Sequence, residues 1–123
     1  MAKLLIVEDD LILDEAYRKK YSGQYDIRVE TEGEGGIKAI KSWKPDVVLL
    51  DLYLPGKSSG LDVLSFLKKD VSTARIPVLV ITNLPDATEK VKAMGADECF
   101  MKTDVDLDLI EKSLRDILTK ATR

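Results

Sequence analysis

Polar residues that could bind a metal ion and a phosphoryl group directly follow four short apolar runs of this chain. They are Glu8, Asp9 and Asp10 after residues 4–7, Asp51 after 47–50, Thr82 after 78–81, and Lys102 after 99–101. Carboxylate oxygens suit Mg²⁺, which commonly uses one or two carboxylates together with phosphate oxygens. An ammonium group and a hydroxyl beside them would complete a cradle for a phosphoryl group. A carboxylate can also accept such a group covalently.

The composition excludes several other kinds of chemistry. The chain has 123 residues with no histidine and one cysteine, which removes histidine-based catalysis, cysteine-cluster zinc sites and an internal disulfide. Nineteen basic and 22 acidic residues give a net charge of −3, so we expect no direct binding of nucleic acid. The apolar runs are too short to span a membrane and no signal peptide opens the chain, so we expect a cytoplasmic protein.

The elements that must position these residues alternate along the sequence. Three continuous apolar runs, residues 4–7, 47–50 and 78–81, are too short for helices and are typical of strands covered on both faces. Residues 25–30 alternate with period two and residues 99–101 form a short run, which predicts two edge strands.

Helical spacing fills the segments between the strands. Apolar residues recur every three or four positions in five segments, at 13–21, 37–43, 61–67, 87–94 and 107–117. The first stripe consists of Leu13, Ala16, Tyr17 and Tyr21. Residues 31–34 and 59–62 have the sequence of helix capping boxes.

Five strand–helix units with short connections predict one α/β domain over residues 1–123. We expect a flavodoxin-like (βα)5 three-layer sandwich, with a parallel sheet in the strand order 2-1-3-4-5. Ligands of such sheets bind beyond the carboxyl ends of the strands, near the switch in strand order. Because that switch lies between the first and third strands, Asp9 and Asp51 should converge there.

Each of these residues also has a purely structural interpretation. Acids between a strand and a helix often cap the helix, and a single aspartate at a strand end is often a turn residue. Threonine favours strands, and most lysines are solvated on the surface. Their joint placement on one edge of one sheet favours a functional site.

The ordered set of segments resembles the receiver domain of two-component response regulators over essentially the whole chain. The segments that carry the resemblance are residues 4–10, 45–56, 60–61, 76–82, 95–97 and Lys102. The resemblance implies that Asp51 accepts a phosphoryl group from a histidine kinase or a histidine phosphotransfer protein. It also implies that Thr82 and Lys102 bind the phosphoryl oxygens.

The same resemblance implies a Mg²⁺ site. Asp9, Asp51 and the backbone carbonyl of Tyr53 would bind the ion directly, and Glu8 would act through a metal-bound water. The domain would promote its own phosphorylation and dephosphorylation without being a conventional enzyme. Its output would be a change in contacts with an unidentified output protein, or a phosphorylation-dependent homodimer, through the fourth helix, fifth strand and fifth helix.

The chain departs from the receiver pattern at three places. Cys99 stands where receivers usually carry an aromatic residue three positions before the lysine, and Phe100 should face the opposite side of the strand. Thr103 stands where receivers usually have a proline joined by a cis peptide, which leaves a cis bond and a different loop path both open. The loop between Asp51 and Gly60 has one extra residue.

Three other functions fit the predicted fold. A flavodoxin-type cofactor site is disfavoured because the acids at residues 8–10 would repel a phosphate. A Mg²⁺-dependent hydrolase could use the same acids, although such enzymes often carry an Asp-x-Asp pair and Tyr53 follows Asp51 at that spacing. An unphosphorylated scaffold that keeps only the receiver fold also stays open.

Overall fold

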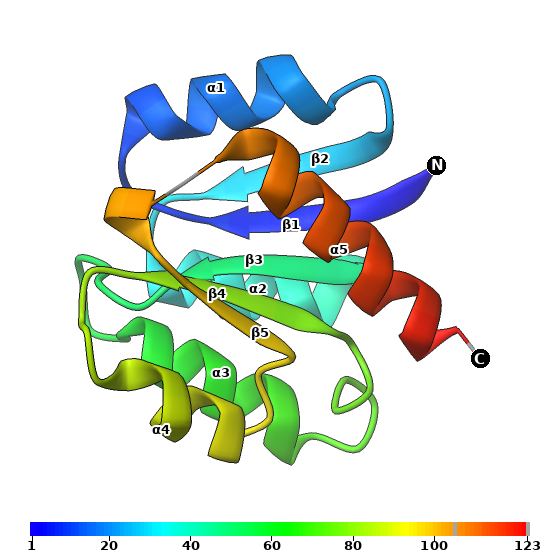
Figure 1. Ribbon diagram of the computed structural model, residues 1–123. Coiled ribbons are helices and arrows are strands. Elements are labelled where there is room, and N and C mark those ends of the chain that lie inside the picture. Colours follow the sequence, from blue (N-terminus) through cyan, green and yellow to red (C-terminus); the bar gives the residue numbers. More distant parts are fainter. Residues whose placement is uncertain (105, 123) are drawn as a thin grey trace.

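A parallel sheet of five strands forms the centre of the protein, in the order β2-β1-β3-β4-β5. The computed structural model describes residues 1–104 and 106–122. In Figure 1 the arrowheads of β1, β2 and β3 point to the left-hand edge of the sheet. The fold class and strand order predicted from the sequence are confirmed. The strands are β1 (Ala2–Val7), β2 (Tyr25–Glu30), β3 (Val47–Asp51), β4 (Val78–Thr82) and β5 (Glu98–Met101).

Helices cover both faces of this sheet. Helices α1 and α5 pack on one face, and α2, α3 and α4 pack on the other (Figure 1). None of the helices in the described part of the chain combines the length and the apolar character that crossing a membrane requires. The helices are α1 (Leu11–Tyr21), α2 (Gly33–Trp43), α3 (Gly60–Lys69), α4 (Ala87–Ala93) and α5 (Leu107–Ala121), with a 3-10 turn at Lys102–Asp104.

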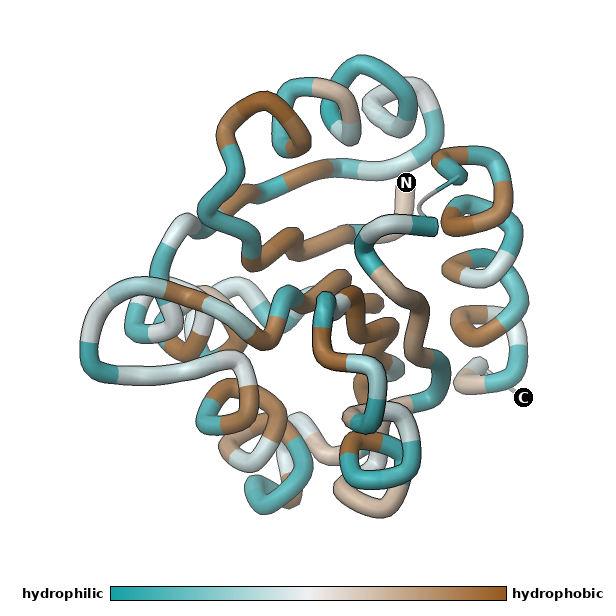
Figure 2. The backbone as a smooth tube through the Cα atoms, turned by 60° about the vertical axis from the view of Figure 1, so that its left-hand side comes forward, coloured by the Kyte–Doolittle hydropathy of each residue, from teal (hydrophilic) through white to brown (hydrophobic). Residues whose placement is uncertain are grey.

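The period-two alternation of the strands divides the core into two halves. In β1, Leu5 and Val7 pack with α2, α3 and α4, whereas Leu4 and Ile6 pack with α1 and α5. All four side chains are fully buried. Figure 2 shows hydrophobic residues concentrated in the central strands. Burial on both faces explains why these strands are continuous apolar runs.

One glycine allows the chain to pass closely over the end of β3. The amide of Gly60 donates to the carbonyl of Leu52 at 2.9 Å. A Cβ at Gly60 would overlap the carbonyl oxygen of Asp51 and the Cα of Leu52. The start of α3 is therefore fixed against the strand that carries Asp51.

The two predicted capping boxes have different outcomes. Ser59 and Asp62 form the reciprocal box at the start of α3, with N···O distances of 2.8 and 3.2 Å, as predicted. The prediction for residues 31–34 is wrong, because Glu32 is the N-cap residue of α2 and makes no side-chain cap bond. The carboxylate of Glu34 instead accepts a hydrogen bond from the backbone amide of Ser58, in the loop before α3.

The first turn of α1 buries a charged side chain that the apolar pattern did not predict. Tyr17 and Tyr21 are buried as predicted, but the third buried residue of this helix is Asp14. Leu11 and Ile12 are 70% and 85% exposed. The predicted residue Leu13 is partly buried and packs against this half of the core, so the apolar stripe is confirmed, and Asp14 is a buried residue that it did not include.

Candidate functional site

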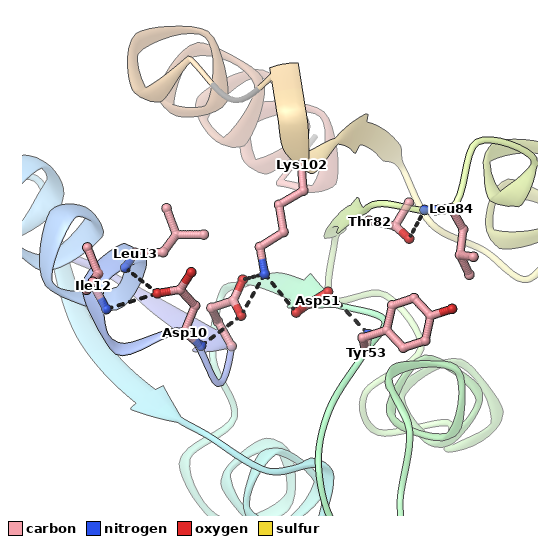
Figure 3. Close-up of polar contacts among 9 residues, drawn as sticks. Asp10, Ile12, Leu13, Asp51, Tyr53, Thr82, Leu84 and Lys102 are labelled. Atoms are coloured by element: carbon pink, nitrogen blue, oxygen red, sulfur yellow. Dashed lines mark hydrogen bonds and ion pairs between the residues drawn. The ribbon is translucent and has the colours of Figure 1, made fainter.

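Lys102 links the ends of two neighbouring strands at the carboxyl edge of the sheet. Its Nζ lies 2.9 Å from Glu8 Oε1, just beyond β1, and 3.2 Å from Asp51 Oδ2, at the end of β3. Figure 3 shows the lysine side chain extending from the end of β5 toward Asp51. Because these strands are parallel, residues distant in the sequence meet at one edge.

The two carboxyl groups that contact Lys102 are almost completely shielded from water. Glu8 is 2% and Asp51 4% exposed. Burial raises the pKa of Glu8 to about 7, while hydrogen bonds from Lys102 and the Asp10 amide oppose the shift. Burial alone would lower the pKa of Lys102, but the hydrogen bond to Glu8 and the charge of Asp51 raise it overall. The lysine thus stays cationic and compensates the negative charge of the edge.

Three carboxyl groups at this edge fit a divalent cation. Glu8, Asp9 and Asp51 each offer one carboxylate oxygen, and these oxygens all lie within 4.8 Å of one another. Asp9 is exposed, so the cluster is open to solvent on one side. An all-oxygen donor set of this kind suits Mg²⁺ better than a softer metal.

Asp10 has a structural role. Its Oδ1 accepts hydrogen bonds from the amides of Ile12 and Leu13 at 3.0 and 3.1 Å, which caps the start of α1 (Figure 3). Its own amide donates to Glu8 Oε2 at 3.0 Å. The cap therefore also helps to orient the buried glutamate beside Lys102.

Tyr53 lies at the rim next to Asp51. Its backbone amide donates to Asp51 Oδ1 at 3.2 Å, and its side chain is 61% exposed (Figure 3). The two oxygens of Asp51 therefore contact different groups, the Tyr53 amide on one side and Lys102 on the other. The Tyr53 carbonyl stays a predicted metal ligand.

Thr82 ends β4, the strand next to Asp51, and is fully buried. Its Oγ1 accepts a hydrogen bond from the amide of Leu84 at 3.0 Å, within the loop that leads to α4 (Figure 3). The structure thus brings Glu8, Asp9, Asp51 and Lys102 into one cluster. It keeps the Thr82 hydroxyl engaged in its own loop.

The region around β5 resolves two questions that the sequence raised. Cys99 packs toward the core half under α2, α3 and α4, and Phe100 packs toward the other half, as the strand alternation predicted. No peptide bond among the described residues is cis, so the bond between Lys102 and Thr103 is trans. The chain forms the 3-10 turn Lys102–Asp104 at this point, which is the different loop path that the sequence left open.

Sequence reasoning missed two features of the site. The first is the contact between Lys102 and Glu8, because the predicted partners of the lysine were the Asp51 carboxylate and the phosphoryl group. The second is a pair of buried polar groups, Asp14 and Tyr17, whose side-chain oxygens have no hydrogen-bond partner among the described residues. The period of α1 could have indicated Asp14, because it lies three residues before Tyr17 and seven before Tyr21 on one helix face.

Two bacterial proteins are similar to this chain in sequence. Protein PilH of Pseudomonas aeruginosa is 32% identical over 123 residues, which cover 96% of this chain and 98% of PilH. The DNA-binding response regulator MtrA of Mycobacterium tuberculosis is 34% identical over 103 residues, or 81% of this chain. The match spans 43% of MtrA, less than half of that protein.

Two solved structures share the fold. The signal receiver domain of a protein described as a LuxO repressor, from Vibrio parahaemolyticus, has a TM-score of 0.89 and 27% identity, covering 98% of this chain and 92% of that one. The receiver domain of a sensor histidine kinase from Pseudomonas aeruginosa, solved with a magnesium ion in its active-site cleft, has a TM-score of 0.81 and 18% identity. It covers 96% of this chain and 98% of that one.

A family model agrees with these likenesses. The model described as the response regulator receiver domain matches residues 4–115, which include all of the sheet except the first two residues of β1, and every residue of the acidic cluster. Together with the strand order and the cluster at the carboxyl edge, this match shows that the chain belongs to the response regulator receiver domain family.

Proposed function

We propose that Asp51 is the phosphoacceptor of a phosphorylation-dependent signalling switch. The observation that carries the proposal is the contact between Asp51 Oδ2 and the Lys102 ammonium, beside the carboxylate oxygens of Glu8 and Asp9. The buried Asp51 carboxylate contacts one cation, Lys102, and lies beside oxygen ligands for a second cation, Mg²⁺. Two cations at this position would neutralise the negative charge of an incoming phosphoryl group. Receiver domains act as signalling switches and exchange phosphoryl groups with histidine kinases or phosphotransfer proteins.

The chemical step is a transfer between two proteins. A carboxylate oxygen of Asp51 attacks the phosphorus of a phosphohistidine on the kinase or phosphotransfer protein. The new O–P bond forms as the P–N bond breaks, and the imidazole nitrogen keeps the electron pair. The product is an acyl phosphate on Asp51. These 123 residues contain no histidine, so the phosphohistidine donor would lie outside them.

The chain's own groups would act mainly by positioning and charge. The Lys102 ammonium would leave its shared contact with Glu8 and Asp51 to neutralise the phosphoryl oxygens. The Tyr53 amide would keep one Asp51 oxygen fixed. Glu8, Asp9, Asp51 and the Tyr53 carbonyl would hold Mg²⁺, with Glu8 acting through water. When bound, the ion supplies charge neutralisation for the phosphoryl oxygens.

The proposed output begins at Thr82. A phosphoryl oxygen is a strong acceptor, so the Thr82 side chain would rotate to donate its hydroxyl hydrogen to it. That rotation would move Oγ1 away from the Leu84 amide, from which it now accepts a hydrogen bond. Such an exchange would move the loop before α4 and bias two conformations of the domain. Contacts through α4, β5 and α5 with an output protein or a second copy of the chain would then change.

The wider setting belongs to the same proposal. Residues 1–123 would act as one receiver domain, and the match to nearly all of PilH supports this extent. We propose a cytoplasmic location, no direct contact with nucleic acid or membrane, and a domain that promotes its own phosphorylation and dephosphorylation. A hydrolase or an unphosphorylated scaffold is not favoured, because the family and the complete acid, threonine and lysine set both fit a receiver.

An amide-resolved NMR titration with phosphoramidate and Mg²⁺ tests this function. We expect chemical-shift changes at the amides of Thr82, Leu84 and Lys102 in the wild type and none in Asp51→Asn. Asp26→Asn is the matched control, since Asp26 is an exposed aspartate on the edge strand β2 and loses the same charge. Equal responses of the wild type and Asp51→Asn would contradict the assignment of Asp51.

A further inference from the structure

The loop between β3 and α3, residues 52–59, carries Tyr53 at one end and the cap of α3 at the other. Its first end is fixed by the Tyr53 amide on Asp51 and by the Gly60 amide on the Leu52 carbonyl. Leu54 packs against the core, but the following stretch, residues 56–59, is Gly-Lys-Ser-Ser and has no apolar side chain to bury.

A carboxylate from another element supports that stretch. Glu34, in the first turn of α2, accepts a hydrogen bond from the Ser58 amide, with an N···O distance of 2.5 Å. The two residues are 24 positions apart in the sequence. The neighbouring Gly33 lies so close that a Cβ there would overlap the Ser58 carbonyl. The amino end of α2 therefore contacts the loop through both a side chain and the backbone.

Ser58 lies immediately before the start of α3, in the same loop as Tyr53 at the predicted metal-binding edge. Ser59, the next residue, forms the capping box with Asp62. Residues 55–57 thus connect two fixed points, the end of the loop held by the Asp51–Tyr53 bond and the packing of Leu54, and the Glu34–Ser58 bond. Without the Glu34–Ser58 bond, the unsupported part of the loop would extend to Ser59, and the Tyr53 backbone could move away from Asp51.

We propose that Glu34 is a positioning residue for the phosphoacceptor site, acting through the Ser58 amide on the loop that carries Tyr53. The proposal rests on the assignment of Asp51 and the Mg²⁺ site made above. An acid in the first turn of a helix can also act simply on the helix dipole. Glu32 provides the comparison, because it is the N-cap residue of α2 and makes no side-chain cap bond. The carboxylates of Glu32 and Glu34 both lie next to Gly56.

Three variants separate the positioning role from a general charge effect. Glu34→Ala removes the acceptor, Glu34→Gln keeps an acceptor oxygen without the charge, and Glu32→Ala removes a matched charge. The first readout is hydrogen exchange of the amides of residues 53–58 by NMR without metal. The second is the dissociation constant for Mg²⁺ by calorimetry, and the third is the rate of phosphorylation by acetyl phosphate.

We expect Glu34→Ala to speed exchange of the Ser58 amide and to weaken Mg²⁺ binding by about 10-fold, the low end of the effect of groups that orient metal ligands. Glu34→Gln should restore most of the affinity, and Glu32→Ala should stay within about twofold of the wild type. Equal effects of Glu34→Ala and Glu32→Ala, or faster loop exchange with unchanged Mg²⁺ affinity, would overturn the proposal. Failure of the wild type to bind Mg²⁺ or accept a phosphoryl group would instead overturn the proposed function, and loop exchange would still report on Glu34.

Discussion

Replacing Asp14 by asparagine should stabilise the protein, and the gain should grow as the pH rises. Asp14 lies on the inner face of α1, is 4% exposed, and has no hydrogen-bond partner for either carboxyl oxygen among the described residues. Burial raises the pKa of Asp14 to about 7, and the nearby charge of Asp10 adds to the shift. The cations Arg18 and Lys102 oppose it.

The size of the effect follows from linkage between protonation and folding. An aspartate outside this environment has a pKa of 3.8, so the native state binds the proton more tightly by about three pKa units. At about 1.4 kcal/mol per pKa unit, the ionised group costs about 4 kcal/mol of stability. The pKa of Asp14 is higher in the native state than in the unfolded chain, so protonation of this carboxyl stabilises the native protein. This contribution is fully present below about pH 4 and is lost as the pH rises through about 7. Asparagine keeps a buried polar group but cannot ionise.

The assay is urea unfolding at about pH 5 and about pH 8, with EDTA present so that metal binding does not contribute. The advantage of Asp14→Asn over the wild type should grow by about 2 to 3 kcal/mol between these two pH values. Glu15→Gln is the control, because Glu15 is an exposed acid on the same helix. Its effect should stay within about 0.5 kcal/mol at both pH values.

Glu8, whose pKa is also raised, is present in both proteins, so its contribution cancels in the difference. A stability difference between Asp14→Asn and the wild type that does not change with pH would refute the reasoning. It would mean that the Asp14 carboxyl is solvated or paired in solution.

Three further outcomes follow from the site. Gly60→Ala should lose about 2 to 4 kcal/mol in urea unfolding, because its Cβ would overlap the Asp51 carbonyl and Leu52, and an unchanged midpoint would contradict this packing. Mg²⁺ at about 100 times its dissociation constant should stabilise the wild type by about 2.7 kcal/mol in thermal unfolding, reversibly with EDTA; no shift would argue against the metal site. The phosphorylated protein should persist for minutes or longer, because the exposed rim residues Tyr53 and Leu84 offer no side-chain amide or acid to position water. Loss of the phosphorylated mass within seconds would refute that expectation.

The sheet and the acidic cluster could be predicted from the sequence because both follow from the apolar runs and from the parallel direction of the strands. Residues 4–7, 47–50 and 78–81 are buried on both faces, so their runs of apolar residues identify them as central strands. In a parallel sheet the carboxyl ends share an edge, which brings Glu8 close to Asp51 without knowledge of any side-chain rotamer.

The details that were missed depend on contacts between distant elements. The first turn of α1 buries Asp14 and exposes Ile12, and its start is fixed by the Asp10 cap rather than by the apolar pattern. Similarly, Glu34 reaches across to Ser58 instead of closing a capping box with Thr31, because the loop before α3 lies against the start of α2. Local sequence patterns contain no information about such neighbours.

The most direct test of the central claim is the intact mass of the protein after incubation with acetyl phosphate, with and without Mg²⁺, for the wild type and Asp51→Asn. The proposed function predicts a gain of one phosphoryl group in the wild type that requires Mg²⁺ and is absent in Asp51→Asn. A gain of the same size in Asp51→Asn, or no gain in a wild type that binds Mg²⁺, would contradict the assignment of Asp51 as the phosphoacceptor.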